Sequence, residues 1–176
     1  MVRYEYFMVD ADDTILDYKQ AEINAINKVF NHINMECNIK AGEVFGDICK
    51  ELWSLYKLDN VNDEIVQAQY HSLYYEYQIE RFRKLKMEFD FDILAEELSE
   101  LYLNSFAEET VAICHAEEVC AKISAVCKLI IITNGLTRIQ LSRLGMFKPY
   151  IYKTYVSEEI GFINQVTDTS TMLSTI

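Results

Sequence analysis

The apolar residues of this 176-residue chain follow two patterns: short unbroken runs, and longer stretches in which apolar positions recur every three or four residues. The unbroken runs, Tyr6–Val9 and Leu129–Ile132, each end in polar residues, which is typical of buried parallel strands. The recurring positions predict helices through residues 21–33, 48–56, 63–87, 94–102, 119–126 and 136–144. A strand, a long helical segment, a second strand and a further helix together predict an α/β protein.

Acidic residues gather where the first run ends, at Asp10, Asp12 and Asp13. Because ligands of an open α/β sheet bind at the carboxyl ends of its strands, the alternate spacing of Asp10 and Asp12 lets both carboxylates face one pocket. An EF-hand calcium loop is excluded, since its sixth and twelfth positions would be Ile15 and Ala21 instead of glycine and glutamate.

Two interpretations of the acidic cluster remain. It is either a solvated turn in which Asp17 caps the next helix, or a reactive site in which Asp10 attacks an electrophile while Asp12 donates and then recovers a proton. A similar choice applies to Thr133-Asn134-Gly135, after the second run. A hydroxyl and free backbone N–H groups at a strand-to-helix junction suit an oxyanion such as phosphate, whereas the structural interpretation is a turn and a helix cap.

The longest helical stretch carries an aromatic patch and, after it, a basic stretch from Arg81 to Lys86. Tyrosine rings suit stacking on a nucleobase, but an aromatic stripe at helical spacing is more often part of a core, which is the interpretation we favour. The basic stretch is interpreted as a solvated helix face rather than a phosphate site. The aromatic patch consists of Tyr70, Tyr74, Tyr75 and Tyr77.

Net charge and hydropathy exclude several partners. The 16 basic against 28 acidic residues give a net charge of −12, which opposes binding to nucleic-acid backbones and to anionic membranes. No apolar segment is long enough to span a bilayer, and the N-terminal run is too short and too soon acidic for a secretory signal. We expect a cytoplasmic protein.

The five cysteines are odd in number and irregularly spaced, so they do not predict a disulfide framework. They also lack the paired spacing with histidine that a zinc site requires. Reduced thiols are expected. The cysteines are Cys37, Cys49, Cys114, Cys120 and Cys127.

The segment from Phe7 to Asp17 resembles the first motif of the haloacid dehalogenase (HAD) superfamily, an apolar strand followed by Asp-x-Asp-x-Thr. Most members carry glycine where this chain has Asp13. The run ending in Thr133-Asn134-Gly135 resembles the second motif, and the helical segment between them resembles a cap. Landmarks in that segment resemble the subgroup of pyrimidine 5'-nucleotidases: Leu52-Trp53, Tyr56, Arg81-Phe82 and Leu101-Tyr102-Leu103.

The resemblance implies a Rossmann-like HAD core with a parallel sheet that is incomplete at its C-terminal side. This core would comprise residues 1–15 and 106–176, and an all-helical cap domain would comprise residues 16–105. It also implies a phosphohydrolase that acts on a small phosphate monoester, such as a nucleoside monophosphate, and uses Mg²⁺.

The resemblance further assigns roles to individual residues. Asp10 would form an aspartyl-phosphate, and Asp12 would act as general acid and then base. Asp10 and the backbone carbonyl of Asp12 would hold Mg²⁺. The Thr133 hydroxyl and the N–H groups of Asn134 and Gly135 would hold the phosphate.

The resemblance ends at Gly161. There the family continues into a lysine and a proline, whereas this chain reads Phe162-Ile163-Asn164-Gln165, and no lysine follows Lys153. The fourth motif, an acidic pair that completes the magnesium site, is also missing. Two explanations of the missing motifs are left open: the chain is a naturally divergent member of the family, or its sequence is truncated or frame-altered. Magnesium needs only one or two carboxylates with water and substrate phosphate, so weak binding is expected.

A second hypothesis follows from the missing motifs and the tyrosine-rich cap. The chain would be a non-catalytic, largely helical binding or dimerisation protein that retains the front half of the HAD fold. This hypothesis predicts a homo-oligomer and no magnesium-dependent turnover, whereas the first predicts hydrolysis.

Overall fold

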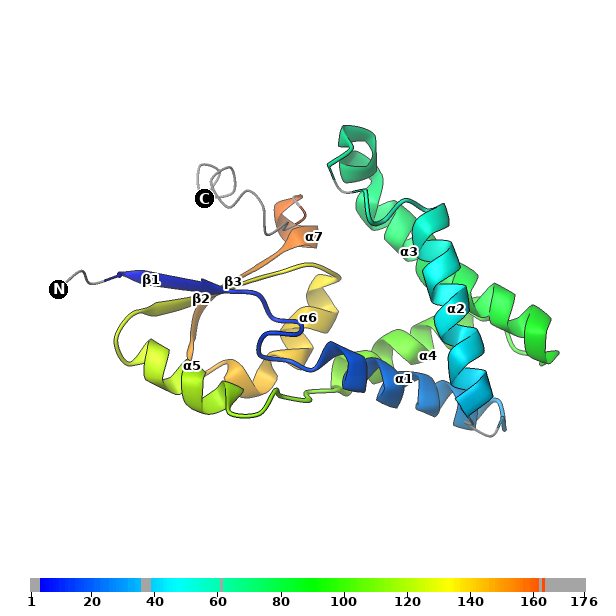
Figure 1. Ribbon diagram of the computed structural model, residues 1–176, viewed down its shortest axis with the longest axis horizontal. Coiled ribbons are helices and arrows are strands. Elements are labelled where there is room, and N and C mark those ends of the chain that lie inside the picture. Colours follow the sequence, from blue (N-terminus) through cyan, green and yellow to red (C-terminus); the bar gives the residue numbers. More distant parts are fainter. Residues whose placement is uncertain (1–3, 36–38, 61, 162, 164–176) are drawn as a thin grey trace. The chain divides into compact units, whose positions relative to one another are not determined.

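The structure is a computed structural model that describes residues 4–35, 39–60, 62–161 and 163. Its strands form a parallel sheet in the order β1 (Tyr6–Val9), β2 (Lys128–Thr133) and β3 (Ile151–Val156) (Figure 1). β1 pairs with β2 from Tyr6 opposite Lys128 to Val9 opposite Ile131. Both predicted strands and their parallel alignment are confirmed, and β3 extends the sheet on the other side of β2.

β3 joins β2 through an irregular register. Leu129 lies opposite Ile151, but Ile130 lies opposite Lys153, so Tyr152 bulges out of the ladder. Bulges are rare between parallel strands. Because opposite residues of a parallel pair point to the same side, the side chain of Ile151 shares a side of the sheet with Leu129.

Helices make up most of the remaining described chain. Their bounds are α1 (Tyr18–His32), α2 (Ile39–Leu55), α3 (Glu64–Phe89), α4 (Ala95–Glu108), α5 (Ala116–Ser124), α6 (Thr137–Arg143), the 3-10 helix η1 (Gly145–Phe147) and α7 (Ser157–Ile160). Asp17 caps α1 as predicted, because its Oδ1 accepts a hydrogen bond from the Gln20 N–H at 2.9 Å. None of the described helices is long and apolar enough to cross a membrane.

The chain divides into two compact units. The sheet unit comprises residues 1–23 and 106–176, and the helical unit comprises residues 24–105. The first boundary therefore falls inside α1, later than the predicted boundary after residue 15. The start of α1 is tied to the sheet unit because the Asp17 N–H donates to the Val111 carbonyl at 2.8 Å and the Tyr18 ring lies 5.4 Å from that of Phe106.

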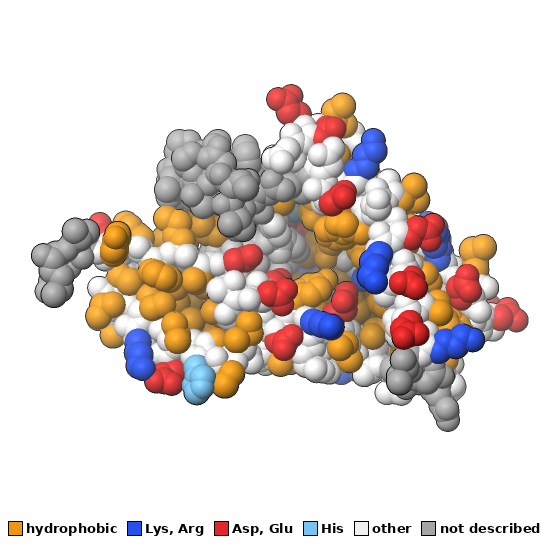
Figure 2. Space-filling model, viewed as in Figure 1, with side chains coloured by type: hydrophobic (Ala, Val, Ile, Leu, Met, Phe, Trp, Pro, Cys, Tyr) orange, Lys and Arg blue, Asp and Glu red, His pale blue; other side chains and the backbone are white. Residues whose placement is uncertain are grey.

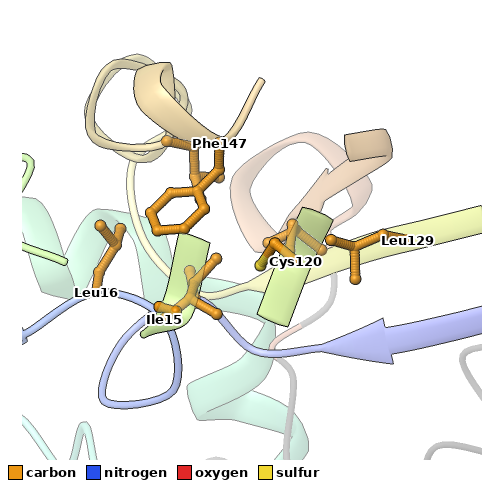
Figure 3. Close-up of a cluster of buried hydrophobic side chains, with 9 residues drawn as sticks. Ile15, Leu16, Cys120, Leu129 and Phe147 are labelled. Atoms are coloured by element: carbon orange, nitrogen blue, oxygen red, sulfur yellow. The ribbon is translucent and has the colours of Figure 1, made fainter. Parts of the chain in front are cut away.

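The core of the sheet unit lies between the strands, α5 and η1 (Figure 3). Leu129 and Ile131 contribute from β2, Cys120 from α5 and Phe147 from η1, each at most 1% exposed. The turn after β1 inserts Ile15 and Leu16 into the same cluster, which also includes Ala11, Ala116 and Leu144. The acidic turn is therefore held in place by its own apolar residues, Ile15 and Leu16, which pack in the core.

The apolar positions of the helix predicted through residues 119–126 lie only partly on the buried face of α5, which ends at Ser124. Val119 and Val126 are 49% and 81% exposed, whereas Ala116 and Cys120 are buried and Ile123 packs against the core. Small and sulfur-containing side chains fit beneath the sheet here, so the buried face is rotated relative to the one marked by the two valines.

β1 is also not the buried strand predicted from its composition. Tyr6, Phe7 and Met8 are 43%, 43% and 37% exposed, and hydrophobic side chains gather over this strand in Figure 2. In the sheet formed by the described residues, β1 is an edge strand, whereas β2 lies between two neighbours and is buried from Leu129 to Thr133. Similar apolar runs thus have different burial because of their position in the sheet.

Asp63 caps α3, the longest described helix of the helical unit, where the sequence predicts a helix to begin. The Oδ1 of Asp63 accepts hydrogen bonds from the N–H groups of Ile65 at 2.8 Å and Val66 at 3.4 Å. Asp90 ends α3 in a left-handed conformation with φ 47°, and its N–H donates to the Lys86 carbonyl.

The aromatic patch of α3 is divided between core and surface. Tyr70 and Tyr77 are buried, as the favoured interpretation expected, whereas Tyr75 is 54% exposed. The interpretation of the basic stretch as a solvated face is wrong at one position, because Arg81 is only 1% exposed. Arg83 and Lys84 do form surface ion pairs, with Glu96 and Glu51 respectively.

We predict that Phe147→Ala lowers the free energy of unfolding by about 3–5 kcal/mol, because it removes a fully buried ring from the core of the sheet unit. Met146→Ala is the control, since Met146 is adjacent and 37% exposed, and its cost should stay below about 1 kcal/mol. Urea unfolding followed by circular dichroism measures both. Equal losses in the two variants would contradict the assigned core.

Candidate functional site

The acidic turn after β1 is a compact hydrogen-bonded loop. The Ala11 carbonyl accepts from the N–H groups of Ile15 at 3.0 Å and Leu16 at 2.9 Å, and the Asp13 N–H donates to the Leu16 carbonyl at 2.8 Å. Ala11, Ile15 and Leu16 point into the core, whereas Asp13 is exposed and has φ 55°. Aspartate tolerates this left-handed conformation better than most residues, so Asp13 fits the turn.

Asp10 lies directly after β1 with its carboxylate partly withdrawn from water. Its Oδ1 accepts a hydrogen bond from the Ala11 N–H at 2.7 Å. Burial, opposed by that hydrogen bond and reinforced by the negative charges of Asp12 and Asp13, raises the pKa of Asp10 to about 6. Within the described part of the chain, no lysine, arginine or histidine forms an ion pair with Asp10. The site therefore contains a carboxylate that a bound cation would stabilise.

Asp12, in contrast, is held by two side chains of α6. Arg143 Nη1 lies 2.5 Å from Asp12 Oδ1, and Gln140 Nε2 donates to Oδ2 at 2.9 Å. Arg143 is fully buried, with its guanidinium 4.2 Å from the centre of the Phe106 ring and its Nε donating to the Glu109 carbonyl at 3.3 Å. These contacts with α6 fix the orientation of the Asp12 carboxylate.

The sequence did not suggest Gln140 or Arg143 as site residues. They are three positions apart and share one face of α6, and both are buried. Leu141, the apolar residue directly after Gln140, is 49% exposed. The available signal was that Gln140 and Arg143 lie at helical spacing beside the apolar positions Ile139 and Leu144, so the buried face of the helix carries a polar pair.

Thr133, Asn134 and Gly135 follow β2 at the same edge of the sheet. Thr133 is 1% exposed, and its hydroxyl lies 3.5 Å from the Asn134 carbonyl, which also accepts from Gln140 Nε2 at 2.7 Å. Gly135 has φ 124°, and a Cβ there would lie 3.1 Å from Gln140 Nε2. Glycine is therefore favoured both by its backbone conformation and by the close approach of Gln140.

Backbone donors around the start of α6 already have partners within the chain. The Gly135 N–H donates to Ser157 Oγ at 3.1 Å, and the Thr137 N–H donates to Glu158 Oε2 at 2.7 Å. Ser157 and Glu158 begin α7, directly after β3. An oxyanion approaching Gly135 and Thr137 would meet this hydroxyl and this carboxylate, neither of which the sequence suggested as part of the site.

Sheet register explains why these residues meet. Val9 lies opposite Ile131, and Thr133 lies opposite Val156, so the residues that follow the three parallel strands converge on one edge. Asp10 and Asp12 follow β1, Thr133 ends β2, and Ser157 follows β3. This is the edge at which ligands of open α/β sheets bind.

The residues present offer a small donor set for a magnesium ion. Among the described residues there is no group of three or more histidine, cysteine, aspartate or glutamate side chains that could hold a metal. The Asp12 carboxylate is occupied by Arg143 and Gln140, which leaves the Asp10 carboxylate and the Asp12 backbone carbonyl. Magnesium accepts such a set when water and substrate phosphate supply the other ligands, and the raised pKa of Asp10 fits a neighbouring cation.

Comparison with known proteins finds that this chain is similar to members of the haloacid dehalogenase superfamily. No family model matches the sequence. The chain is 28% identical over 166 residues to YfnB of Bacillus subtilis strain 168, a protein assigned to the HAD hydrolases, and the match covers 92% of this chain. It spans 65% of the length of YfnB, so less than two thirds of that relative.

Solved structures agree in fold. A crystal structure of YfnB bound to magnesium matches with a TM-score of 0.70 and 26% identity, covering 92% of this chain and 67% of that one. A 2-haloacid dehalogenase from Pseudomonas syringae matches with a TM-score of 0.52 and 19% identity, covering 92% and 66%, which supports the fold alone. The predicted α/β fold class is confirmed, whereas the nucleotidase-like subgroup stays a prediction.

We predict that the conformation of Asp13, rather than its charge, matters for stability. Asp13→Gly and Asp13→Asn should keep the free energy of unfolding within about 0.5 kcal/mol of the parent, because both residues tolerate φ 55°. Asp13→Val should lower it by about 1–2 kcal/mol, since a β-branched residue is strained in this region. Urea unfolding measures all three, and a valine variant as stable as the glycine variant would contradict the assigned turn.

We predict a pH-dependent stability that arises from Asp10. Its pKa rises from the ordinary 3.8 to about 6 on folding, so the protonated form favours the folded state. This contribution is present below pH 4 and is lost as the pH rises through 6. At pH 7.5 Asp10→Asn should therefore raise the free energy of unfolding relative to the parent, by about 1–2 kcal/mol because solvent screens part of the effect at this half-buried carboxylate, with little difference at pH 4.

The matched control for this pH dependence is Asp47→Asn, because the Asp47 side chain is 80% exposed. It should change stability by less than about 0.5 kcal/mol at either pH. Urea titrations of the parent and both variants in metal-free buffer from pH 4 to pH 8 provide the measurement. An effect of Asp10→Asn that is constant across this range would show that Asp10 does not titrate as described.

Proposed function

We propose that this chain is a magnesium-dependent phosphohydrolase that acts on a small phosphate monoester through an aspartyl-phosphate on Asp10. The observation that carries the proposal is the contrast between two neighbouring aspartates. Asp10 is partly buried, has a pKa of about 6 and forms no ion pair with a described residue, whereas Asp12 is oriented by Arg143 and Gln140. One carboxylate is thus available for attack and the other is held in a fixed position.

In the proposed first step, an Asp10 carboxylate oxygen attacks phosphorus and the bond to the leaving alcohol breaks. Asp12, in its protonated form, donates its proton to the leaving oxygen. In the second step Asp12 takes a proton from water, and that water attacks the phosphorus and releases inorganic phosphate and Asp10. Each Asp12 oxygen has a second lone-pair site beside the bond to Arg143 or Gln140, so it can still exchange a proton.

Magnesium, when bound through Asp10 and the Asp12 carbonyl, would neutralise charge on the phosphoryl group. The YfnB structure was solved with magnesium bound, which supports the same ion for this chain. The resemblance to pyrimidine 5'-nucleotidases makes a nucleoside monophosphate our proposed substrate class. Thr133, Asn134 and Gly135 are the proposed phosphate contacts. Gly135 would exchange its bond to Ser157 for one to the phosphate.

A second candidate function is favoured by the exposed apolar edge of the sheet. Tyr6, Phe7 and Met8 present large apolar side chains on a strand with one described neighbour, an arrangement that invites pairing with another chain. In this alternative the chain is a non-catalytic binding or dimerisation protein. It is supported further by Phe162-Ile163, which follow Gly161 where the resembled family continues into lysine and proline.

The test is hydrolysis of p-nitrophenyl phosphate and of a set of nucleoside monophosphates, with and without magnesium. We predict magnesium-dependent turnover by the parent chain and a loss of at least about 10³-fold in Asp10→Asn, because the nucleophile is removed. Asp47→Asn, which changes an exposed carboxylate outside the site, should retain full activity. Hydrolysis that survives in Asp10→Asn, or persists in EDTA, would refute the assignment.

The same preparation separates the two candidate functions. Turnover by a monomer in analytical ultracentrifugation supports the phosphohydrolase and excludes an obligate dimer. Folded protein without turnover, together with a dimer at micromolar concentration, supports the binding function. The substitution Phe7→Lys should then shift the dimer toward monomer, because it places a charge on the exposed edge.

A further inference from the structure

The helical unit contains a buried arginine, Arg81, that pairs with none of the described carboxylates. Arg81 is 1% exposed, and among the described residues no aspartate or glutamate lies within ion-pair distance of it. Its Nη2 donates to Gln78 Oε1, whereas its Nε is buried without a hydrogen-bond partner in the described structure. A buried cation is costly unless an anion or several dipoles compensate for it.

Aromatic rings surround the Arg81 guanidinium. Its Cζ lies 4.5 Å from the ring centre of Tyr102 and 4.8 Å from that of Tyr77, with Phe45 at 5.5 Å and Phe82 at 5.7 Å. Ring faces attract a cation, but they carry no net charge. The aromatic residues therefore stabilise the position of Arg81 without neutralising it.

The remaining group at the guanidinium is the thiol of Cys49, on α2. Arg81 Nη1 points toward Cys49 Sγ, with the two atoms 3.9 Å apart. Cys49 is half-buried, unlike Arg81, which is 1% exposed. A guanidinium at this distance favours the thiolate over the thiol, and a thiolate would supply the anion that the arginine lacks.

The other titratable groups that face this pair are tyrosines, and they ionise later than a thiol. Tyr74 and Tyr77 come from α3, and Tyr102 from α4. Burial raises the pKa of Tyr77 well above its ordinary value, whereas the pKa of an unperturbed cysteine is about 8.5. Lys84, three residues after Arg81, is paired with Glu51 at 2.6 Å, and Lys50, the residue after Cys49, lies 3.6 Å from Asp47. Cys49 is therefore the first group here to become an anion.

We propose that Cys49, paired with Arg81, is a reactive thiolate and a site of oxidation by hydrogen peroxide. The thiolate sulfur attacks one peroxide oxygen, the O–O bond breaks, and hydroxide leaves. Sulfur loses two electrons and becomes a sulfenic acid, while the peroxide is reduced to hydroxide. The site lies in the helical unit and does not depend on the proposed hydrolase chemistry.

The other described cysteines lack such a cation and serve as internal references. Cys114 is exposed, Cys120 is buried with a pKa raised by burial, and Cys127 is half-buried with its sulfur 3.5 Å from the Ile123 carbonyl. If exposure alone decided reactivity, Cys114 would react faster than Cys49. If the contact with Arg81 decides it, the order is reversed at neutral and mildly acidic pH.

The experiment treats the full chain with iodoacetamide from pH 5.5 to pH 9 and measures the alkylation rate of each cysteine by peptide mass spectrometry. At pH 6.5 we expect Cys49 to react about tenfold faster than Cys114, because a pKa lowered by one unit raises the thiolate fraction about tenfold. With hydrogen peroxide and then dimedone, the sulfenic acid label should appear first on Cys49. Slower alkylation of Cys49 than Cys114 at every pH would overturn the proposal.

Variants identify the cause. Arg81→Met should reduce the alkylation rate of Cys49 at pH 6.5 about tenfold, whereas Lys84→Met removes a neighbouring cation outside the ring cluster and should leave the rate within about twofold. An equal effect of both variants would show that general charge, not the Arg81 contact, controls the thiol, and would overturn the proposal. The comparison of Cys49 with Cys114 in the parent decides the matter even if Arg81→Met does not fold.

Discussion

Parallel pairing of β1 with β2 is the constraint on which the rest of the sheet unit depends. It joins the first strand to one that begins at Lys128, so the entire helical unit is a single excursion between two neighbouring strands. Two parallel strands that are neighbours in a sheet require a crossover connection of this kind, because the chain must return to the end of the sheet at which the first strand began. Once the strands pair in this register, the acidic turn and Thr133 lie at the same edge of the sheet. The pairing alone brings them together, because they are far apart in the sequence. The helical unit can thus differ in size while the edge keeps its geometry.

Two buried arginines show how differently this chain compensates for a cation. Arg143 lies against an aromatic ring and also reaches the Asp12 carboxylate, so its charge is matched and its role is to orient. Arg81 lies beside four rings, the nearest at 4.5 Å, and no described carboxylate pairs with it, so its charge acts on whatever neighbouring group can ionise. The same side chain, in two aromatic environments, therefore supports orientation in one unit and reactivity in the other.

The sequence predicted the parts of the site that lie where an apolar run gives way to polar residues. Asp10, Asp12 and Thr133 stand out because that change is local and the strand direction follows from it. Gln140, Arg143 and Arg81 could not be found in this way, since a polar residue in a helix is expected to face solvent until its tertiary neighbours are known. The burial of β1 was overestimated for a related reason: the composition of Tyr6–Val9 resembles that of a central strand, and only the sheet order shows it at an edge.

The bulge at Tyr152 has a consequence for how the edge is assembled. A strict two-residue alternation along β3 would put Ile151, Lys153 and Tyr155 on one side of the sheet, yet the ladder places Ile151 with Leu129 and Val156 with Thr133. The extra residue thus changes the parity of the strand midway. Without it, Ser157 would be displaced along the strand by about one residue, roughly 3.3 Å, which is more than its hydrogen bond to Gly135 could bridge. The alignment of β3 with the site is therefore set by a single inserted residue at the opposite end of the strand.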